Sequence, residues 1–300
     1  MELSPFQSKI LSAVDKRVSA RSKKGLIVEA RAGAGKSTRI WLICQQLQAQ
    51  GFSPQEVTAL VFGRKNKDDL QKKIEQKVGS EWGSVVRTLH SLCYGIYRDA
   101  LNVKHNRVNS DNSKYTRIAQ EYGFFPLKDE SRGIDVPGGL LEGEKPAIYS
   151  EKDFTDLLDR LRLYCLEATE SNVEYLVNLY KLGINDIGLV AAAAEFCLSE
   201  GIKVATNLRY WLDMTDMVYV PCKMATRSDS RFNAAISGRR EQLRFILLDE
   251  AQDTDLLQIE MLSLLVNPAT SFLTAVGDRN QAVYFFRGAL NDGMDRIKER

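Results

Sequence analysis

The sequence lacks the features that would place it in a membrane or send it out of the cell. None of its apolar runs approaches the roughly 18 residues that a bilayer-spanning helix requires. Its first residues, MELSPFQSKI, have neither the basic flank nor the apolar core of a secretory signal. We therefore expect a cytoplasmic protein without a membrane partner.

Cysteine is scarce, and neither sign of charge dominates. The chain has five cysteines, Cys44, Cys93, Cys165, Cys197 and Cys222. Their number is odd and they contain no C-x-x-C pair, which predicts free thiols in a reducing compartment and disfavours a metal centre. The 41 basic and 39 acidic residues leave a net charge of +2, which neither requires nor excludes a nucleic-acid partner. The 300 residues suffice for roughly two domains, or for one domain with a large insertion.

The most informative motif is the stretch LIVEARAGAGKST at residues 26–38. Its apolar start predicts a buried strand, its small residues predict a loop, and the run that follows predicts a helix, which is the context of a P-loop. Gly33 and Gly35 let backbone N–H groups surround a phosphate, Lys36 would reach the β- and γ-phosphates, and the Ser37 hydroxyl would take one position around Mg²⁺. The alternative is a glycine turn before an amphipathic helix. The predicted nucleotide-binding residues are Ala30 (which replaces the first consensus glycine), Arg31, Ala32, Gly33, Ala34, Gly35, Lys36, Ser37 and Thr38.

Strands and helices alternate on both sides of a long central segment. Apolar runs predict strands at residues 57–62, 84–87, 245–249 and 272–276, and helical spacing predicts helices at 1–20, 68–77 and 256–266. This alternation favours an α/β fold with a parallel sheet. The central segment shows helical patterns only, at residues 115–122, 153–169, 171–182 and 187–198. We expect residues 1–100 and 208–300 to form the α/β domain and residues 101–207 to form a mostly helical insertion.

Two carboxylates, Asp249 and Glu250, directly follow an apolar strand. At the carboxyl edge of a parallel sheet, Asp249 can hold a metal ion through water, and Glu250 can polarise an attacking water. The alternative is the acidic first turn of a helix. The strand at 272–276 should lie beside this one, and Gln281 in the loop after it could bond the γ-phosphate or the attacking water.

Aromatic residues follow next to a cation, in the run Tyr284-Phe285-Phe286-Arg287. Aromatic faces stack on unpaired bases, and arginine contacts phosphates. The commoner fate of such rings is core packing. Adjacent phenylalanines flanked by Tyr and Arg cannot all point inward, so we expect an exposed ring here.

In order, the chain carries Phe6-Gln7, ARAGAGKS (30–37), VFGRKNKDDL (61–70), TLHS (88–91), LLDEAQDT (247–254) and VGDRNQAVYFFRGA (276–289). These motifs resemble those of the first RecA-like half of UvrD/Rep/PcrA-type superfamily-1 DNA helicases. The resemblance covers most of the α/β parts. It implies a RecA-like P-loop NTPase sheet, with the helical insertion corresponding to the family's 1B subdomain. It further implies an ATP-dependent helicase that uses ATP and Mg²⁺ to move 3′ to 5′ on single-stranded DNA or 3′-tailed duplex DNA.

The resemblance also implies roles for individual residues. Gln7 matches the glutamine that reads adenine, and Lys36 and Ser37 match the ligands of the phosphates and Mg²⁺. Asp249 matches the metal carboxylate, Glu250 the catalytic base, and Gln281 the γ-phosphate sensor. His90 on its own would be typical of a structural histidine, but its place in TLHS indicates a DNA contact. The positions that line the single-strand track are matched by Phe62, Thr88, His90, Tyr284, Phe286 and Arg287.

The chain also departs from the family pattern. Arg64 replaces an asparagine and Asn66-Lys67 an alanine pair, so we expect Arg64 to bind DNA, with extra phosphate contacts at this turn. Residues 211–216 match the family's "DFDD" helix loosely. The sequence ends shortly after the VGDRNQ motif, so we expect it to bind Mg·ATP and single strands but to hydrolyse ATP slowly. A second RecA-like domain would then come from the rest of a longer chain or from another subunit.

Two other functions explain part of the pattern. A non-motor module or regulator that binds single strands under the control of ATP would differ from a motor in whether coding sequence continues after Arg300. A P-loop kinase acting on a small molecule would explain Lys36, but it leaves the DEAQDT, TLHS and YFFRG runs without a role.

Overall fold

The computed structural model describes residues 4–20, 25–29, 36–124, 127–129, 134–136, 149–207, 210–281 and 293–299 of the chain. The chain divides into two units, of which the first contains residues 1–100 and 221–300 and the second contains residues 101–220. The carboxylate pair and the start of the helix after the P-loop both belong to the first unit.

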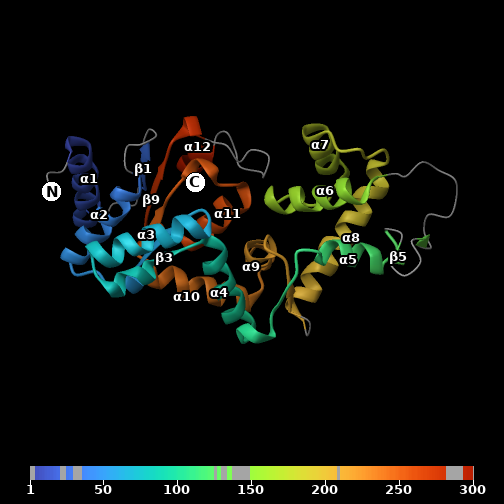
Figure 1. Ribbon diagram of the computed structural model, residues 1–300, viewed down its shortest axis with the longest axis horizontal. Coiled ribbons are helices and arrows are strands. Elements are labelled where there is room, and N and C mark those ends of the chain that lie inside the picture. Colours follow the sequence, from blue (N-terminus) through green and yellow to red (C-terminus); the bar gives the residue numbers. More distant parts are fainter. Residues whose placement is uncertain are drawn as a thin grey trace. The chain divides into compact units, whose positions relative to one another are not determined.

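A five-stranded parallel sheet forms the centre of the first unit, in the order β1–β9–β8–β2–β3 (Figure 1). Its strands are β1 (Leu26–Glu29), β2 (Val57–Leu60), β3 (Val86–Arg87), β8 (Phe245–Leu248) and β9 (Phe272–Gly277). Every residue of β2 and β8 is buried, as expected for inner strands of a parallel sheet, which is covered on both faces. The predicted α/β fold with a parallel sheet is confirmed, and so is the expected pairing of β8 with β9.

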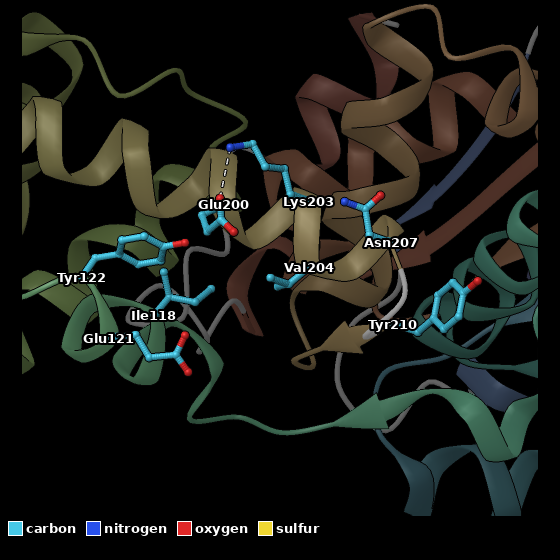
Figure 2. Close-up of a pocket in the computed structure, with 8 residues that line it drawn as sticks. All are labelled: Ile118, Glu121, Tyr122, Glu200, Lys203, Val204, Asn207 and Tyr210. Carbon is cyan, nitrogen blue, oxygen red and sulfur yellow. Dashed lines mark hydrogen bonds and ion pairs between the residues drawn. The ribbon is translucent and has the colours of Figure 1, made fainter.

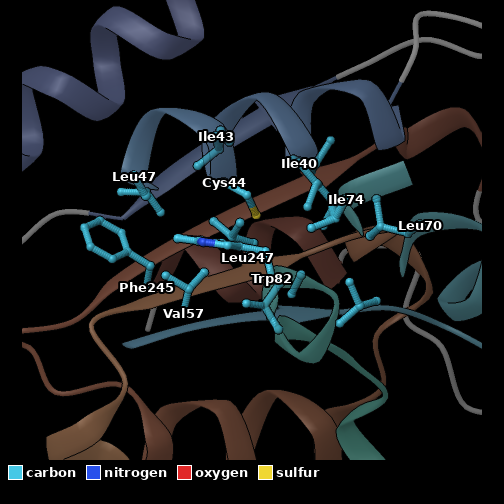
Figure 3. Packing of buried hydrophobic residues seen from close by; sticks show 14 of the residues in the cluster. Ile40, Ile43, Cys44, Leu47, Val57, Leu70, Ile74, Trp82, Phe245 and Leu247 are labelled. Carbon is cyan, nitrogen blue, oxygen red and sulfur yellow. The ribbon is translucent and has the colours of Figure 1, made fainter. Parts of the chain in front are cut away.

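Three helices and one face of the sheet share a buried apolar cluster: α1 (Pro5–Ala20), α2 (Lys36–Ala49) and α3 (Arg64–Lys77). Figure 3 shows Ile43 and Cys44 of α2 in this cluster with Leu247 of β8 and Trp82. Dense packing of these apolar side chains holds α2 against the sheet. The other helices of this unit are α4 (Leu89–Leu101), α10 (Ser230–Gln242), α11 (Leu256–Leu265) and α12 (Gly293–Glu299).

Side-chain caps mark where two of these helices begin. Ser4 and Gln7 form a capping box on α1, in which the Ser4 N–H donates to Gln7 Oε1 (2.9 Å) and the Gln7 N–H donates to Ser4 Oγ (3.2 Å). Asp255 caps α11 by accepting a hydrogen bond from the Gln258 N–H at 2.8 Å. The predicted start of α11 at Leu256 is confirmed, and α1 begins at Pro5, within the predicted range 1–20.

The prediction that a helix begins at Asp68 is wrong. Helix α3 begins at Arg64, about one turn earlier, because the chain turns at Gly63 with φ 76° and the Lys67 N–H then bonds the Gly63 carbonyl oxygen. Strands β2 and β3, on either side of α3 in the sequence, are shorter than the predicted ranges 57–62 and 84–87. β2 ends at Leu60, and Ser80–Val85 forms a 3-10 helix before β3.

The second unit is mostly helical, as predicted. Its helices are α5 (Lys114–Glu121), α6 (Glu151–Leu163), α7 (Glu170–Tyr180) and α8 (Ile187–Thr206), and α9 (Asp216–Thr226) leads back into the first unit. It also contains two short two-stranded sheets, which pair β4 (Asn109–Ser110) with β7 (Trp211–Leu212) and β5 (Leu127–Asp129) with β6 (Ile134–Val136).

The loose match of residues 211–216 to a helix is wrong. Trp211 and Leu212 form β7, and the next helix, α9, begins only at Asp216. The Asp213 carboxylate accepts a hydrogen bond from the Asp216 N–H at 2.7 Å, so its side chain bonds the backbone three residues ahead, as helix-capping residues do.

A buried ionic network holds the second unit together. The Asp216 carboxylate, which is 0% exposed, accepts bonds from Lys114 Nζ (2.5 Å), the Tyr115 hydroxyl (3.0 Å) and Arg162 Nη1 (3.0 Å). Arg162 also pairs with Asp213 at 2.7 Å. Burial and the neighbouring Asp216 charge raise the pKa of Asp213 to about 6. The opposite charges of Lys114 and Arg162 outweigh burial at Asp216 and lower its pKa.

Two further findings concern the class of protein. No helix in the part of the chain that the structure describes is long and apolar enough to cross a membrane. The five cysteines are free, as predicted, and burial raises the pKa of the Cys44 thiol to about 12.

Candidate active site

Neighbouring strands bring three distant segments of the chain to one edge of the sheet. β9 lies between β1 and β8, and all three run parallel, so that their carboxyl ends lie at the same edge. Glu29, the last residue of β1, pairs with Gly277, the last residue of β9. Leu248, the last residue of β8, pairs with Ala275. The end of β1, the carboxylate pair and the loop that contains Gln281 therefore all lie at this edge of the sheet.

The two carboxylates follow β8 at an abrupt turn. Asp249 is 4% exposed, and its N–H still donates to the Leu60 carbonyl oxygen of β2 at 2.9 Å, which extends the ladder by one bond. Glu250 then has φ 51°, a left-handed conformation that is uncommon for a residue with a side chain. Its N–H donates back to Asp249 Oδ1 at 3.1 Å. The turn gives the two residues different surroundings, because Asp249 is buried and Glu250 is half-buried.

Gln252 links the carboxylate turn to the loop after β9. Its Oε1 accepts from the Asp278 N–H at 2.9 Å, and its Nε2 donates to Glu250 Oε2 at 2.8 Å. Within the loop, the Gln281 N–H bonds the Asp278 carbonyl oxygen at 2.9 Å. Gln252 belongs to the LLDEAQDT motif, but no role was predicted for it. Its position two residues after Glu250 was the signal that could have indicated one.

Arg279 connects the loop after β9 to two other elements through ion pairs. Its guanidinium pairs with Glu29 at the end of β1 (2.8 Å) and with Asp295 of α12 (2.7 Å). Hydrogen bonding to Asp295 raises the pKa of Arg279. The loop with Gln281 is therefore tied to β1 on one side and to α12 on the other.

The start of α2 lies near both the carboxylates and the beginning of α1. Arg39 is 4% exposed, and its guanidinium carbon lies 4.9 Å from the centre of the Phe6 ring. Burial lowers the pKa of Arg39, and the charge of Asp249 opposes that shift, which places the two groups within electrostatic reach. Gln7, one residue after Phe6, is half-buried, and its side-chain oxygen Oε1 accepts the hydrogen bond from the Ser4 N–H.

Comparison with known proteins agrees with this geometry. A family model described as the UvrD/REP helicase N-terminal domain matches residues 11–300. The chain belongs to this family. Similar curated proteins include a probable DNA helicase II homolog from Mycoplasma pneumoniae, which is 25% identical over 95% of this chain and 37% of its own length. The ATP-dependent DNA helicase Rep from Salmonella typhimurium is 24% identical, with 88% of this chain and 35% of its own length covered.

The ATP-dependent DNA helicase PcrA from Staphylococcus epidermidis is 23% identical over 90% of this chain and 34% of its own length. The chain thus spans about a third of the length of these relatives. Its five-stranded parallel sheet with a mostly helical insertion is the RecA-like fold that the resemblance predicted.

Several of the predicted site residues lie outside the described residues of this UvrD/REP helicase domain. For Lys36 and Ser37 only the backbone is described, and it forms the first residues of α2. Thr38 is half-buried. The residues that lie outside are Ala30, Arg31, Ala32, Gly33, Ala34, Gly35, Tyr284, Phe286 and Arg287.

Four predicted DNA contacts follow β2 and β3, at the same carboxyl edge of the sheet. Phe62 is half-buried directly after β2, and Arg64 is exposed in the first turn of α3. Thr88 caps α4, because its Oγ1 accepts from the Ser91 N–H at 3.1 Å. His90 is half-buried, and burial lowers its pKa, so that its neutral form is favoured. The structure therefore gives Thr88 a local structural role and leaves Arg64 open to solvent.

The donors at this edge suit a magnesium ion that is held largely by a nucleotide. No cluster of three or more His, Cys, Asp or Glu side chains able to hold a metal ion occurs within the described ranges. Mg²⁺ in nucleotide sites is usually bound by one or two protein oxygens together with phosphates and waters, so it does not need such a cluster. The Asp249 carboxylate at the end of β8 is an oxygen donor of the required kind.

The second unit contains a pocket of about 620 Å³ between α5 and α8 (Figure 2). Two of its lining residues on α8, Lys203 and Glu200, form an ion pair at 3.1 Å. The lining residues are Ile118, Glu121, Tyr122, Glu200, Lys203, Val204, Asn207 and Tyr210. None of the motifs identified in the sequence lies in this pocket.

Proposed function

We propose that this chain binds ATP with Mg²⁺ at the carboxyl edge of its sheet and uses ATP hydrolysis to move along single-stranded DNA. In this proposal it is the ATP-binding part of a 3′-to-5′ DNA helicase. The main support is that Asp249 and Glu250 follow β8 and Gln281 follows β9 at the edge where β1, the strand before the P-loop motif in the sequence, also ends. The relatives Rep and PcrA are named DNA helicases, which supports DNA as the partner.

Each polar group at this edge has a task in the proposed reaction. Glu250 accepts a proton from the attacking water, and Lys36 neutralises charge on the γ-phosphate. Gln281 bonds the γ-phosphate, so loss of that phosphate frees the loop that it shares with Asp278. Asp249 and Ser37 would hold Mg²⁺, which when bound screens the charge of the phosphate oxygens.

Gln7 would read the adenine base of ATP. Recognition of adenine through its exocyclic amine and N7 takes one acceptor and one donor, which a side-chain amide provides. The acceptor oxygen of Gln7 is engaged by the Ser4 N–H at 2.9 Å. Because an amide oxygen has two lone pairs, it can retain the cap and accept from adenine as well. ATP binding would thus order the start of α1.

The proposed DNA track runs along the ends of β2 and β3. Phe62 and Tyr284 are suited to stack on bases, whereas Arg64 and Arg287 are suited to contact phosphates. Thr88, His90 and Phe286 complete the set. We infer single-stranded DNA or a 3′-tailed duplex as the partner. We also infer a second RecA-like domain, in the same polypeptide or another, because an arginine supplied from outside speeds phosphoryl transfer about 10³- to 10⁵-fold. Free cysteines fit a reducing, cytoplasmic setting.

The test separates ATP binding from ATP turnover in the presence of single-stranded DNA. Lys36→Ala is expected to weaken binding of a fluorescent ATP analogue, whereas Glu250→Gln should bind it normally and lose turnover by about 10²-fold or more. Glu241→Gln, which changes an exposed acid on α10, serves as the matched control and should change neither. Normal ATP binding by the Lys36 variant, or normal turnover by the Glu250 variant, would contradict the proposed site.

A further inference from the structure

Gln252 occupies a buried position between two parts of the candidate active site. It lies in the 3-10 turn Ala251–Asp253 and is 4% exposed. Its amide oxygen accepts from the Asp278 N–H (2.9 Å), and its amide nitrogen donates to Glu250 Oε2 (2.8 Å) and to Asp253 Oδ2 (3.3 Å). Both ends of the side chain are therefore hydrogen-bonded to groups on different loops.

The surroundings of Gln252 leave its amide a single orientation. The partner of Oε1 is a backbone N–H, which can only donate, and the partners of Nε2 are carboxylate oxygens, which accept. Gly277 lies directly against the side chain, since a Cβ at that position would stand 2.7 Å from Gln252 Oε1 and 3.1 Å from Gln252 N. The same Cβ would be 2.9 Å from Met294 Sδ of α12, so Gly277 is closely packed between Gln252 and this helix.

This contact has a direct consequence for Glu250. A hydrogen bond to one carboxylate oxygen fixes the orientation of the group, which a general base needs. The partner on the other side, Asp278, also accepts from the Gln281 N–H through its carbonyl oxygen. A continuous chain of bonds therefore connects Glu250, through Gln252 and Asp278, to the backbone of Gln281.

We propose that Gln252 is a positioning residue that orients Glu250 for proton transfer and links it to the turn that carries Gln281. This inference rests on the proposed function, because it assigns Glu250 the role of base. Gln252 touches no substrate in this scheme and acts only through Glu250 and Asp278. A shift of the Gln281 loop on loss of the γ-phosphate would then be transmitted to the base.

Two substitutions test the proposal in the full 300-residue chain. Gln252→Leu keeps the approximate volume but removes both hydrogen bonds. Gln252→Glu keeps the acceptor toward Asp278 and replaces the donor with a carboxylate that faces Glu250 and Asp253. The matched control is Gln258→Leu, a buried glutamine of α11 that is 8% exposed.

Turnover of radiolabelled ATP with saturating single-stranded DNA is the first measurement. We expect kcat to fall about 10- to 100-fold in both Gln252 variants with KM for ATP within about twofold, because only orientation of the base is lost. The control should keep the wild-type kcat and KM. Unchanged kcat in both Gln252 variants would overturn the proposal.

Hydrogen exchange without nucleotide is the second measurement, and it does not depend on catalysis. The Asp278 amide should exchange at least about tenfold faster in Gln252→Leu than in wild type or in the Gln258 control, because its acceptor has gone. If the wild-type chain binds no ATP but this amide loses protection in Gln252→Leu, the proposed function fails and the bridge remains. If the amide keeps its protection, the bridge itself is refuted.

Discussion

The ionic network of the second unit allows a stability prediction whose size follows from the contacts. Asp216→Ala removes a carboxylate that is 0% exposed and that Lys114, Tyr115 and Arg162 all bond. The Lys114 ammonium, also 0% exposed, keeps the Gly201 carbonyl oxygen as a partner at 2.7 Å but loses its counter-charge. Removing one partner of a buried ion pair costs about 3–5 kcal/mol.

That cost should depend on pH. Burial already lowers the pKa of Lys114, and the charge of Asp216 is the main influence that opposes this shift. Without Asp216, the folded-state pKa of Lys114 falls further below its unfolded value, so the unfolded chain binds the proton more strongly. The loss of stability is therefore larger at pH 6 than at pH 9, where the folded variant can hold Lys114 neutral.

The assay is urea unfolding followed by hydrogen exchange on peptides from residues 101–220. With a slope of about 2 kcal/mol per M, a loss of 3–5 kcal/mol lowers the midpoint by about 2 M. Lys203→Ala is the control, because it removes an ion pair on the same unit whose lysine side chain is 61% exposed, and such a pair contributes about 0–1 kcal/mol. A midpoint for Asp216→Ala within about 0.5 M of the control would refute the reasoning.

Three further predictions concern the first unit. The double variant Arg64→Ala, Lys67→Ala should bind single-stranded DNA with a slope of log affinity against log salt that is smaller by about 1.4, at about 0.7 per lost phosphate contact. Lys77→Ala, at the far end of α3, is the control and should leave the slope unchanged. Equal slopes for the wild type and both variants, measured by fluorescence anisotropy, would exclude the extra contacts. Burial raises the pKa of Asp255 to about 7, so its contribution to stability is complete at low pH and is lost as pH rises through 7. Wild type should therefore lose about 1 kcal/mol relative to Asp255→Asn between pH 6 and pH 8 in urea titrations, and a constant difference would count against this. Gly277→Ala should cost about 1–3 kcal/mol, because the new methyl group meets Gln252 Oε1 at 2.7 Å; an unchanged Tm would contradict that contact.

Much of the fold could be predicted from local chemistry. Four apolar residues in a row predict β8 without knowledge of its neighbours, because an inner strand of a parallel sheet is buried on both faces. The Ser4–Gln7 box marks the start of α1, because both groups lie within one helical turn. The position of Asp249 and Glu250 after β8 also follows from sequence order alone. Where the local signals were mixed, at the start of α3 and at residues 211–216, the predicted helix boundaries were wrong.

The sequence predicted that β8 and β9 are neighbours, but only the tertiary structure shows the complete strand order and the side-chain contacts that follow from it. That β9 inserts between β1 and β8 depends on pairing between residues far apart in the chain, and no local pattern records that choice. The bonds from Gln252 to Glu250 and Asp278 depend in turn on this order, because the two loops are neighbours only when β8 and β9 are. The same holds for Asp216 and Lys114, whose charges look solvated in the sequence yet are fully buried. Periodicity and capping act over a few residues, whereas burial and partner choice are properties of the whole packed chain.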